Sequence, residues 1–292
     1  MTSIVIPAHN EARVIGRLLD SLLADSPPGE AGKTGDRADD PDIVVVCNGC
    51  TDETAKIAAA RGPRVRVVEI PVPSKHAAMR AGDDHARGFP RLYVDADVVI
   101  TGADVRALAE PLEDGTSGIL ATAPDRRIPL ASCAWRVRAY YQVWQRLPAV
   151  REGLFGRGVI AVSQAGHARI AALPPLMADD LAASLAFTPG ERRVVDAAAV
   201  VIRPPRTWRD LMRRRVRAAV STAQVEQHRG PDEASARTGK ADLKAILRRE
   251  PRLLVPVVVF VAAAVAARRE ASKAIRAQDF GTWLRDDSSR QN

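Results

Sequence analysis

The sequence alternates short apolar runs with segments in which apolar residues recur every three or four positions. The short runs predict buried strands at residues 3–7, 43–46, 65–70 and 92–94. The periodic segments predict helices at residues 12–23 and 75–85, and a third helix, capped by Thr51 or Asp52, that ends near residue 61. Strands and helices that alternate with short connections predict an α/β fold with a parallel sheet.

The second half of the chain has a looser pattern. It predicts strands at residues 118–123, 159–162 and 192–202 and helices at residues 104–113, 133–147 and 207–225, the last of them very basic. Gly156 and Gly158 precede one of these strands and indicate a turn or a close approach of two backbones.

Two carboxylates, Asp95 and Asp97, follow the predicted strand at residues 92–94. In an extended chain, residues i and i+2 point to the same face, so we expect both side chains to face one cleft. Two acidic groups on one face repel each other unless a cation lies between them, and hard divalent cations take such oxygen ligands. The plainer alternative is a strand that ends in a solvated turn with two capping aspartates.

Three polar clusters follow predicted strands, at residues 9–11, 48–52 and 95–97. In parallel α/β sheets, ligands bind at the carboxyl ends of the strands, so these clusters predict a binding site at that edge. Asp179 and Asp180 form a further acidic pair at the entry to a helix. N-capping is the alternative explanation for this pair.

Composition adds a preference for an anionic partner. The net charge is +8 and the sequence pI is about 9.9, which suits a nucleotide, a nucleic acid or an acidic membrane surface. The sequence has no helix-turn-helix, zinc or aromatic–basic RNA motif, so no nucleic acid is expected. Cys47, Cys50 and Cys133 form no disulfide framework or four-ligand zinc site, although the spacing of the first two also admits a redox role.

An apolar segment, residues 253–267, lies between two arginine clusters. At ~1.5 Å per residue it is shorter than the ~30 Å hydrocarbon core, so we expect a buried helix, an interface helix or one lying in the membrane surface. Core packing, a homodimer and an anionic membrane surface remain open as its environment. The N-terminus lacks a signal-peptide pattern. We therefore expect a cytoplasmic protein, with peripheral contact at the inner face of the cell membrane left open.

The ordered motifs resemble those of the family-2 glycosyltransferases, which have the nucleotide-diphospho-sugar transferase (GT-A) fold. The matching positions are residues 4–11, 45–54, Lys75, residues 95–97 and residues 178–181. The resemblance implies a Rossmann-like, mixed, mostly parallel sheet flanked by helices. It implies a catalytic domain over residues 1–220, with a nucleotide-sugar half at about 1–100 and an acceptor half at about 101–220. Residues 221–292 would form a helical C-terminal extension.

The resemblance also implies roles for the matching residues. The nucleotide pocket would be lined by Pro7, Ala8, His9, Glu11, Asn48 and Asp52. Lys75 would approach the nucleotide or its phosphates. Asp95 would lie at the ribose side, and Asp95 and Asp97 would hold a Mg²⁺ or Mn²⁺ ion that bridges the diphosphate.

The same resemblance assigns the chemistry to the acidic pair and the basic helix. Asp180, with Asp179 beside it, would be the general base that takes the proton of the acceptor hydroxyl. The candidates for stabilising the leaving nucleoside diphosphate are Arg213, Arg214, Arg215 and Arg217. The implied reaction is an inverting, metal-dependent transfer from a UDP-, GDP- or TDP-sugar to a glycan, a lipid-linked acceptor or a small molecule.

Three departures from the family pattern refine this expectation. Asn48 stands where the family often has an aspartate, which leaves the nucleotide base open. The Gln-x-x-Arg-Trp motif of processive synthases is absent from residues 211–217, which argues for transfer of a single sugar. The acidic pair is Asp-Asp instead of the commoner Glu-Asp.

Two other functions remain as alternatives. A sugar-1-phosphate nucleotidyltransferase would share the fold, but residues 8–11 lack its Gly-rich loop with a basic residue. A non-catalytic scaffold with a nucleotide-sugar fold would have no need of Asp180.

Overall fold

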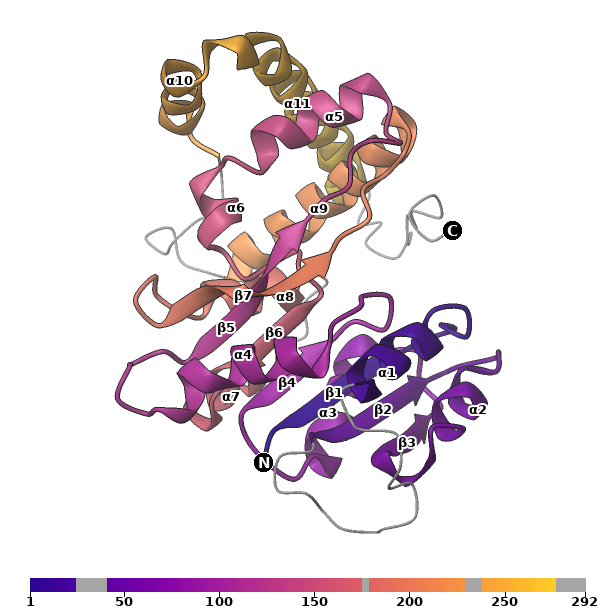
Figure 1. The fold of residues 1–292 in the computed structure, drawn as a ribbon. Helices are drawn as coiled ribbons and strands as arrows, with labels where there is room; N and C mark the ends of the chain where they lie inside the picture. The colour runs from indigo at the N-terminus through magenta and orange to yellow at the C-terminus, as the bar shows by residue number, and fades with distance from the viewer. Residues whose placement is uncertain (25–40, 175–178, 229–237, 277–292) are drawn as a thin grey trace. The chain divides into compact units, whose positions relative to one another are not determined.

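The computed structural model describes residues 1–24, 41–174, 179–228 and 238–276. The chain forms two compact units (Figure 1). Unit 1 comprises Met1–Arg127, Gly156–Leu173 and Phe187–Val201, and unit 2 comprises Ile128–Phe155, Pro174–Ala186 and Ile202–Asn292. The predicted boundary between the catalytic domain and the C-terminal extension, at residue 220, lies inside helix α9 (Trp208–His228). This boundary stays a prediction.

Unit 1 is built on one seven-stranded sheet with the order β3-β2-β1-β4-β6-β5-β7. Its strands are β1 (Ser3–Ala8), β2 (Asp42–Asn48), β3 (Val65–Ile70), β4 (Arg91–Val94), β5 (Ala121–Arg127), β6 (Val159–Val162) and β7 (Arg192–Val201). Strand β6 is antiparallel to its neighbours β4 and β5, and the remaining pairs in this sheet are parallel. The prediction of a mixed, mostly parallel sheet is therefore confirmed.

The helices of unit 1 are α1 (Ile15–Leu23), α2 (Thr54–Ala59), α3 (Lys75–His85), α4 (Gly102–Glu113) and α7 (Gln164–Ala171), with a 3-10 turn at Gly62–Arg64. Strands β1 and β2 are buried at every position, as expected for strands with both faces covered. Helix α1 begins later than the predicted residue 12. Residues 12–14 first form a turn, in which the N–H groups of Val14 and Ile15 both donate to the carbonyl of Glu11 over 3.0 Å.

Unit 2 is helical in its described residues. It contains α5 (Trp135–Trp144), α6 (Pro148–Glu152), α8 (Asp179–Leu185), α9, α10 (Lys240–Arg249) and α11 (Leu254–Arg276), with a 3-10 turn at Pro251–Leu253. Helix α11 packs against α5 and α9 (Figure 1). In this core, Tyr140 stacks on Phe260 with ring centroids 5.1 Å apart. Of the aromatic residues on α5, Tyr140 and Tyr141 are buried, whereas Trp135 is exposed.

Helix α11 is longer than the apolar segment from which we predicted it. It continues from residue 267 to Arg276 because Arg, Lys, Glu and Ala favour helix. Its 23 residues extend over ~34 Å, so the length argument against a membrane span does not apply to the whole helix. Within the described residues, the segment Pro251–Lys273 is the one stretch long and apolar enough to cross a membrane, judged by length and composition.

Candidate active site

The loops that follow β1 and β2 are hydrogen-bonded to each other at the carboxyl edge of the sheet. Asn48 donates from Nδ2 to the carbonyl oxygen of Ala8 over 3.0 Å. Nδ1 of His9 lies 2.6 Å from the carbonyl oxygen of Asn48. Because a carbonyl oxygen only accepts, Nδ1 carries the hydrogen of this contact. The two loops predicted to line a nucleotide pocket therefore form one connected surface.

Asn10 and Cys50 also connect the loops after β1 and β2. Both lie within the predicted polar clusters, but neither was assigned a role of its own. Asn10 has a φ of 54°, which asparagine tolerates better than most residues, and its Oδ1 accepts from the backbone N–H of Thr51 over 2.8 Å. Cys50 Sγ donates to the carbonyl of Ala8 and accepts from the backbone N–H of Asn10, both over 3.4 Å. The sequence signal for this role of Asn10 was asparagine itself, a residue type that is common in turns.

Asp52 connects the two loops through backbone donors. Its Oδ2 accepts from the N–H of Ala12 over 3.1 Å, and its Oδ1 accepts from the N–H of Thr54 over 3.0 Å. Burial raises the pKa of Asp52, but hydrogen bonds from Thr54 and from the N–H of Ala12 outweigh this effect and the pKa is lowered overall. Asp52 is thus a fixed negative charge at neutral pH, beside the residues that open α2.

Asp95 and Asp97 lie in the turn that follows β4. The backbone N–H of Val98 donates to the carbonyl of Asp95 over 3.2 Å, which closes the turn. The expectation of an extended chain across the two carboxylates is therefore wrong, because β4 ends at Val94. Among the described residues there is no group of three or more His, Cys, Asp or Glu side chains suited to a metal ion. A cation at this turn would complete its coordination with ligand oxygens and water.

Lys75 reaches the same turn from the first residue of α3. Its Nζ lies 2.8 Å from Oδ1 of Asp95, and the two side chains are 44% and 40% exposed. Ser74 caps the helix by accepting from the N–H of Ala77 over 3.2 Å. An exposed ion pair is typically worth ~0–1 kcal/mol. A ligand can therefore separate Lys75 from Asp95 at little cost.

Gly158 holds the backbone of Asp95 in place. Its carbonyl accepts from the N–H of Asp95 over 2.8 Å, and its φ is +67°. A Cβ at this position would lie 2.5 Å from Cγ1 of the buried Val98 and 3.3 Å from Oδ2 of Asp95. Glycine is therefore favoured at residue 158 by its positive φ and by the side chains of Val98 and Asp95.

Arg157 anchors the loop that carries Gly158. The residue is 1% exposed, and its Nη1 donates to the carbonyl of Pro124 over 2.7 Å and lies 3.6 Å from Oδ1 of Asp125. Burial lowers the pKa of Arg157 and Asp125 partly offsets this, which leaves the pKa at about 10 and the group charged at neutral pH. Sequence reasoning missed this arginine because its partners lie in β5, 33 residues earlier.

We expect Gly158→Ala to destabilise the fold by about 2–3 kcal/mol, because it adds a left-handed alanine and a contact with Val98. The matched control is Gly118→Ala, where φ is +69° but no atom lies within 4 Å of the added Cβ. Its expected cost is about 1 kcal/mol. Urea unfolding of both variants measures the difference. Equal losses would show that the contact at Gly158 does not constrain the Asp95 turn.

Unit 2 carries the other predicted acidic residue, Asp180. It lies in the first turn of α8 and is exposed, and its Oδ1 accepts from the N–H of Leu181 over 2.7 Å. The same helix buries Leu181 and Ser184, whose Oγ accepts from the N–H of Leu154 over 2.9 Å. The side chain of Asp179 lies outside the described residues. Asp180 is thus exposed to solvent on a helix that is packed within unit 2.

The predicted phosphate-facing arginines of α9 have different surroundings. The guanidinium of Arg215 lies 5.7 Å from the ring centroid of Tyr140, and its Nε is buried with no hydrogen-bond partner among the described residues. Arg213 lies 3.6 Å from Asp210, and Arg214 donates to the carbonyl of Arg203 over 3.5 Å. Arg215 is therefore set against the aromatic core of unit 2.

Similarity to known proteins extends over a large part of the sequence. The sequence model of glycosyl transferase family 2 matches residues 3–168, more than half of the chain. The 4,4'-diaponeurosporenoate glycosyltransferase of Staphylococcus aureus is 33% identical over 129 residues, which are 42% of this chain and 31% of that protein. The match thus spans about a third of the length of this relative.

Two solved structures resemble the fold. Glucosyl-3-phosphoglycerate synthase from Mycobacterium tuberculosis, solved with Mn²⁺, UDP-glucose and phosphoglyceric acid, has a TM-score of 0.50 at 21% identity, over 68% of this chain and 71% of that one. A mycobacterial protein has a TM-score of 0.52 at 20% identity, over 77% of this chain and 74% of that one. Together with the sequence match, these findings show that the chain belongs to glycosyl transferase family 2 and has the GT-A fold.

Proposed function

We propose that this protein is an inverting, metal-dependent glycosyltransferase that moves one sugar from a nucleotide-diphospho-sugar to an acceptor hydroxyl. The observation that carries the proposal is the carboxyl edge of β1, β2 and β4, which are neighbours in the sheet. At this edge the loops bearing His9 and Asp52 are joined by hydrogen bonds, and Lys75 is paired with Asp95. The family membership and the glycosyltransferase name of the S. aureus relative support the same reaction class.

The nucleoside would lie against the connected loops after β1 and β2. Pro7 and Ala8 end β1, and Glu11 and Asp52 follow in the two loops. The side-chain nitrogen of Asn48 already donates to Ala8, so selection of the base would fall to other groups in this pocket. UDP-glucose in the M. tuberculosis synthase makes the uridine series the first to test, ahead of GDP- and TDP-sugars.

Asp95 and Asp97 fit a Mg²⁺ or Mn²⁺ site that the substrate completes. Mg²⁺ commonly binds through one or two carboxylates together with substrate phosphates and water, and this turn offers that donor set. Lys75 would place a positive charge beside the diphosphate. When bound, the cation would stabilise the charge on the departing nucleoside diphosphate as a Lewis acid.

Asp180 is the proposed general base, with Asp179 as its acidic neighbour. An exposed carboxylate in the first turn of a helix can take the proton of a hydroxyl as that oxygen attacks the anomeric carbon. A single displacement inverts the anomeric configuration, so an α-linked donor gives a β-linked product. Arg215 would contribute positive charge toward the leaving diphosphate. A glycan, a lipid-linked molecule and a small molecule all remain candidate acceptors.

The proposal is tested by thermal unfolding of the full chain with UDP, GDP, TDP and their sugars, each with Mn²⁺, with Mg²⁺ or with EDTA. A ligand that binds only the folded state adds ~2.7 kcal/mol at a hundredfold excess over its Kd. We expect one nucleotide series to raise the Tm in the presence of a divalent cation and not in EDTA. The absence of a shift with every nucleotide would contradict the transferase function and favour the non-catalytic scaffold.

A further inference from the structure

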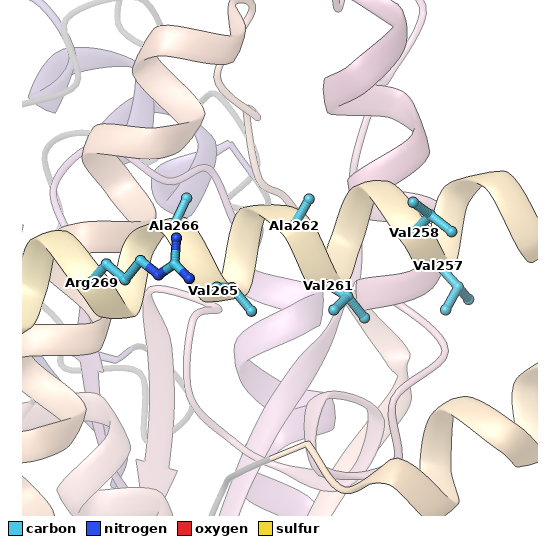
Figure 2. A pocket seen from close by; sticks show the side chains of 7 residues that line it. All are labelled: Val257, Val258, Val261, Ala262, Val265, Ala266 and Arg269. Atoms are coloured by element: carbon cyan, nitrogen blue, oxygen red, sulfur yellow. The ribbon is translucent and has the colours of Figure 1, made fainter.

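One face of α11 is apolar and exposed in the described part of the chain. Its members, called the valine face below, are between 40% and 62% exposed and recur at helical spacing: Leu254, Val255, Val258, Val261 and Val265. A shallow groove runs along α11 (Figure 2). Most of its lining residues lie on the same side of the helix as the valine face, and they include Ala262, Ala266 and Arg269. The opposite side buries Phe260, Ala263 and Ala267 in unit 2. Both sides of α11 are therefore apolar, but only one of them is covered.

Positive charge lies at both ends of the valine face. Arg248 and Arg249 end α10 just before it and are exposed, and Arg268 and Arg269 follow it and are exposed. Two acidic residues lie near these arginines, and both are already paired. Glu250 binds Arg146 and Arg252, with its pKa lowered to about 2 by hydrogen bonds from these two arginines, and Glu270 binds Lys273. An exposed apolar strip can bury its side chains at a lipid surface, and the flanking arginines would be attracted to anionic headgroups.

We propose that the valine face docks on the surface of an anionic lipid bilayer, with α11 parallel to the membrane plane. The valines would enter the boundary between headgroups and acyl chains, and the arginines at the two ends would contact anionic headgroups. Basic side chains near such a surface contribute about 1 kcal/mol each. The inference concerns unit 2 alone and does not depend on the proposed transferase reaction.

The packing of α11 argues against a transmembrane orientation, although its length would allow one. Its covered side contacts α5 and α9. Helix α5 carries the exposed Arg136 and Arg138, and α9 carries Arg213 and its neighbours. Spanning would either draw these arginines into the hydrocarbon, at about 2.5–3.5 kcal/mol each, or separate α11 from its core.

A second copy of the chain is a poorer occupant of the valine face. From Leu254 to Val265 the face is ~17 Å long, and with a helix ~10 Å wide it covers far less than the ~800 Å² per partner of a standard interface. Pairing two such faces would also set arginine clusters against each other in either direction of the helices, since both ends are basic. A bilayer supplies the complementary charge that a second copy lacks.

The proposal is tested by flotation of the full chain with phosphatidylcholine vesicles, with or without about a third of phosphatidylglycerol, in the absence of nucleotide. We expect binding to the anionic vesicles that weakens as salt is raised. The double variant Val258→Gln and Val261→Gln should bind them about tenfold to a hundredfold more weakly, because two apolar groups no longer enter the lipid. Both positions are exposed, and thermal unfolding checks that the variant is folded.

The matched control is Val201→Gln, which changes an exposed valine at the end of β7 in unit 1 and should leave vesicle binding unchanged. Arg268→Gln with Arg269→Gln should reduce the preference for anionic vesicles. Absence of wild-type binding, or equal binding by the valine double variant, would overturn the proposal. So would a wild-type dimer in lipid-free buffer that the same double variant converts to monomer, because the occupant would then be a second copy.

Discussion

Replacing Asp97 with asparagine is expected to lower metal-dependent turnover by at least about a hundredfold. Asparagine keeps the shape of the side chain but removes one of the two carboxylate charges in the turn after β4. A cation at such a site supplies several kcal/mol of charge stabilisation, and each 1.36 kcal/mol corresponds to about tenfold in rate. The measurement is release of nucleoside diphosphate from the donor selected by thermal unfolding, with water as the acceptor and Mn²⁺ varied.

The metal titration separates the role of Asp97 from a general loss of negative charge. Asp84→Asn removes a carboxylate from an exposed position on α3 and should leave both the rate and the Mn²⁺ dependence unchanged. In Asp97→Asn, the Mn²⁺ concentration needed for half-maximal rate should rise as the rate falls. A variant with wild-type turnover and wild-type Mn²⁺ dependence would remove Asp97 from the proposed metal site.

Asp180→Asn should lower kcat by about a hundredfold to ten-thousandfold while nucleotide binding is retained. General acid–base catalysis by one positioned side chain contributes this much, and an amide cannot take the proton. The residue is in unit 2, whereas the proposed nucleotide pocket is made by loops of unit 1. The defect should therefore appear in assays of turnover, measured as the nucleoside diphosphate formed. Calorimetric titration with the nucleotide and Mn²⁺ should give a Kd close to that of the wild type.

The neighbouring carboxylate provides the comparison. Asp179→Asn removes the same charge one residue earlier in α8, and we expect a smaller loss of kcat than for Asp180→Asn. If the two variants lost activity equally, the helix start would act through its total charge and not through one base. If Asp180→Asn kept wild-type kcat, the assignment of the general base would be refuted.

The carboxyl edge of the sheet could be predicted from sequence because each of its parts is local. A buried apolar run followed at once by polar residues marks β1, β2 and β4, and parallel strands must end at the same edge. His9, Asp52 and Asp95 were placed there by this reasoning. How they are held was not predictable, because Lys75 and Asp95 are 20 residues apart and His9 and the carbonyl of Asn48 are 39 residues apart.

Two local expectations were wrong because the pattern of apolar residues does not show where an element ends. The strand pattern at residues 92–94 did not show that Asp95 enters a turn, which is closed by the hydrogen bond from the N–H of Val98 to the carbonyl of Asp95. The end of α11 was placed at residue 267 because apolar residues stop there, yet charged residues with high helix propensity extend the helix. In both cases hydrophobicity marked the buried part of an element and not its end.

During synthesis, β5 leaves the ribosome well before the strand that completes its pairing. Strand β5 ends at Arg127 and its parallel partner β7 begins at Arg192, so the 64 residues between them take about 3–13 seconds at typical elongation rates. Until then β5 has an open edge, and an unpaired edge can recruit other chains. The family-matched region at residues 3–168 thus lacks one strand of its own sheet, and the chain through Val201 is needed to close it.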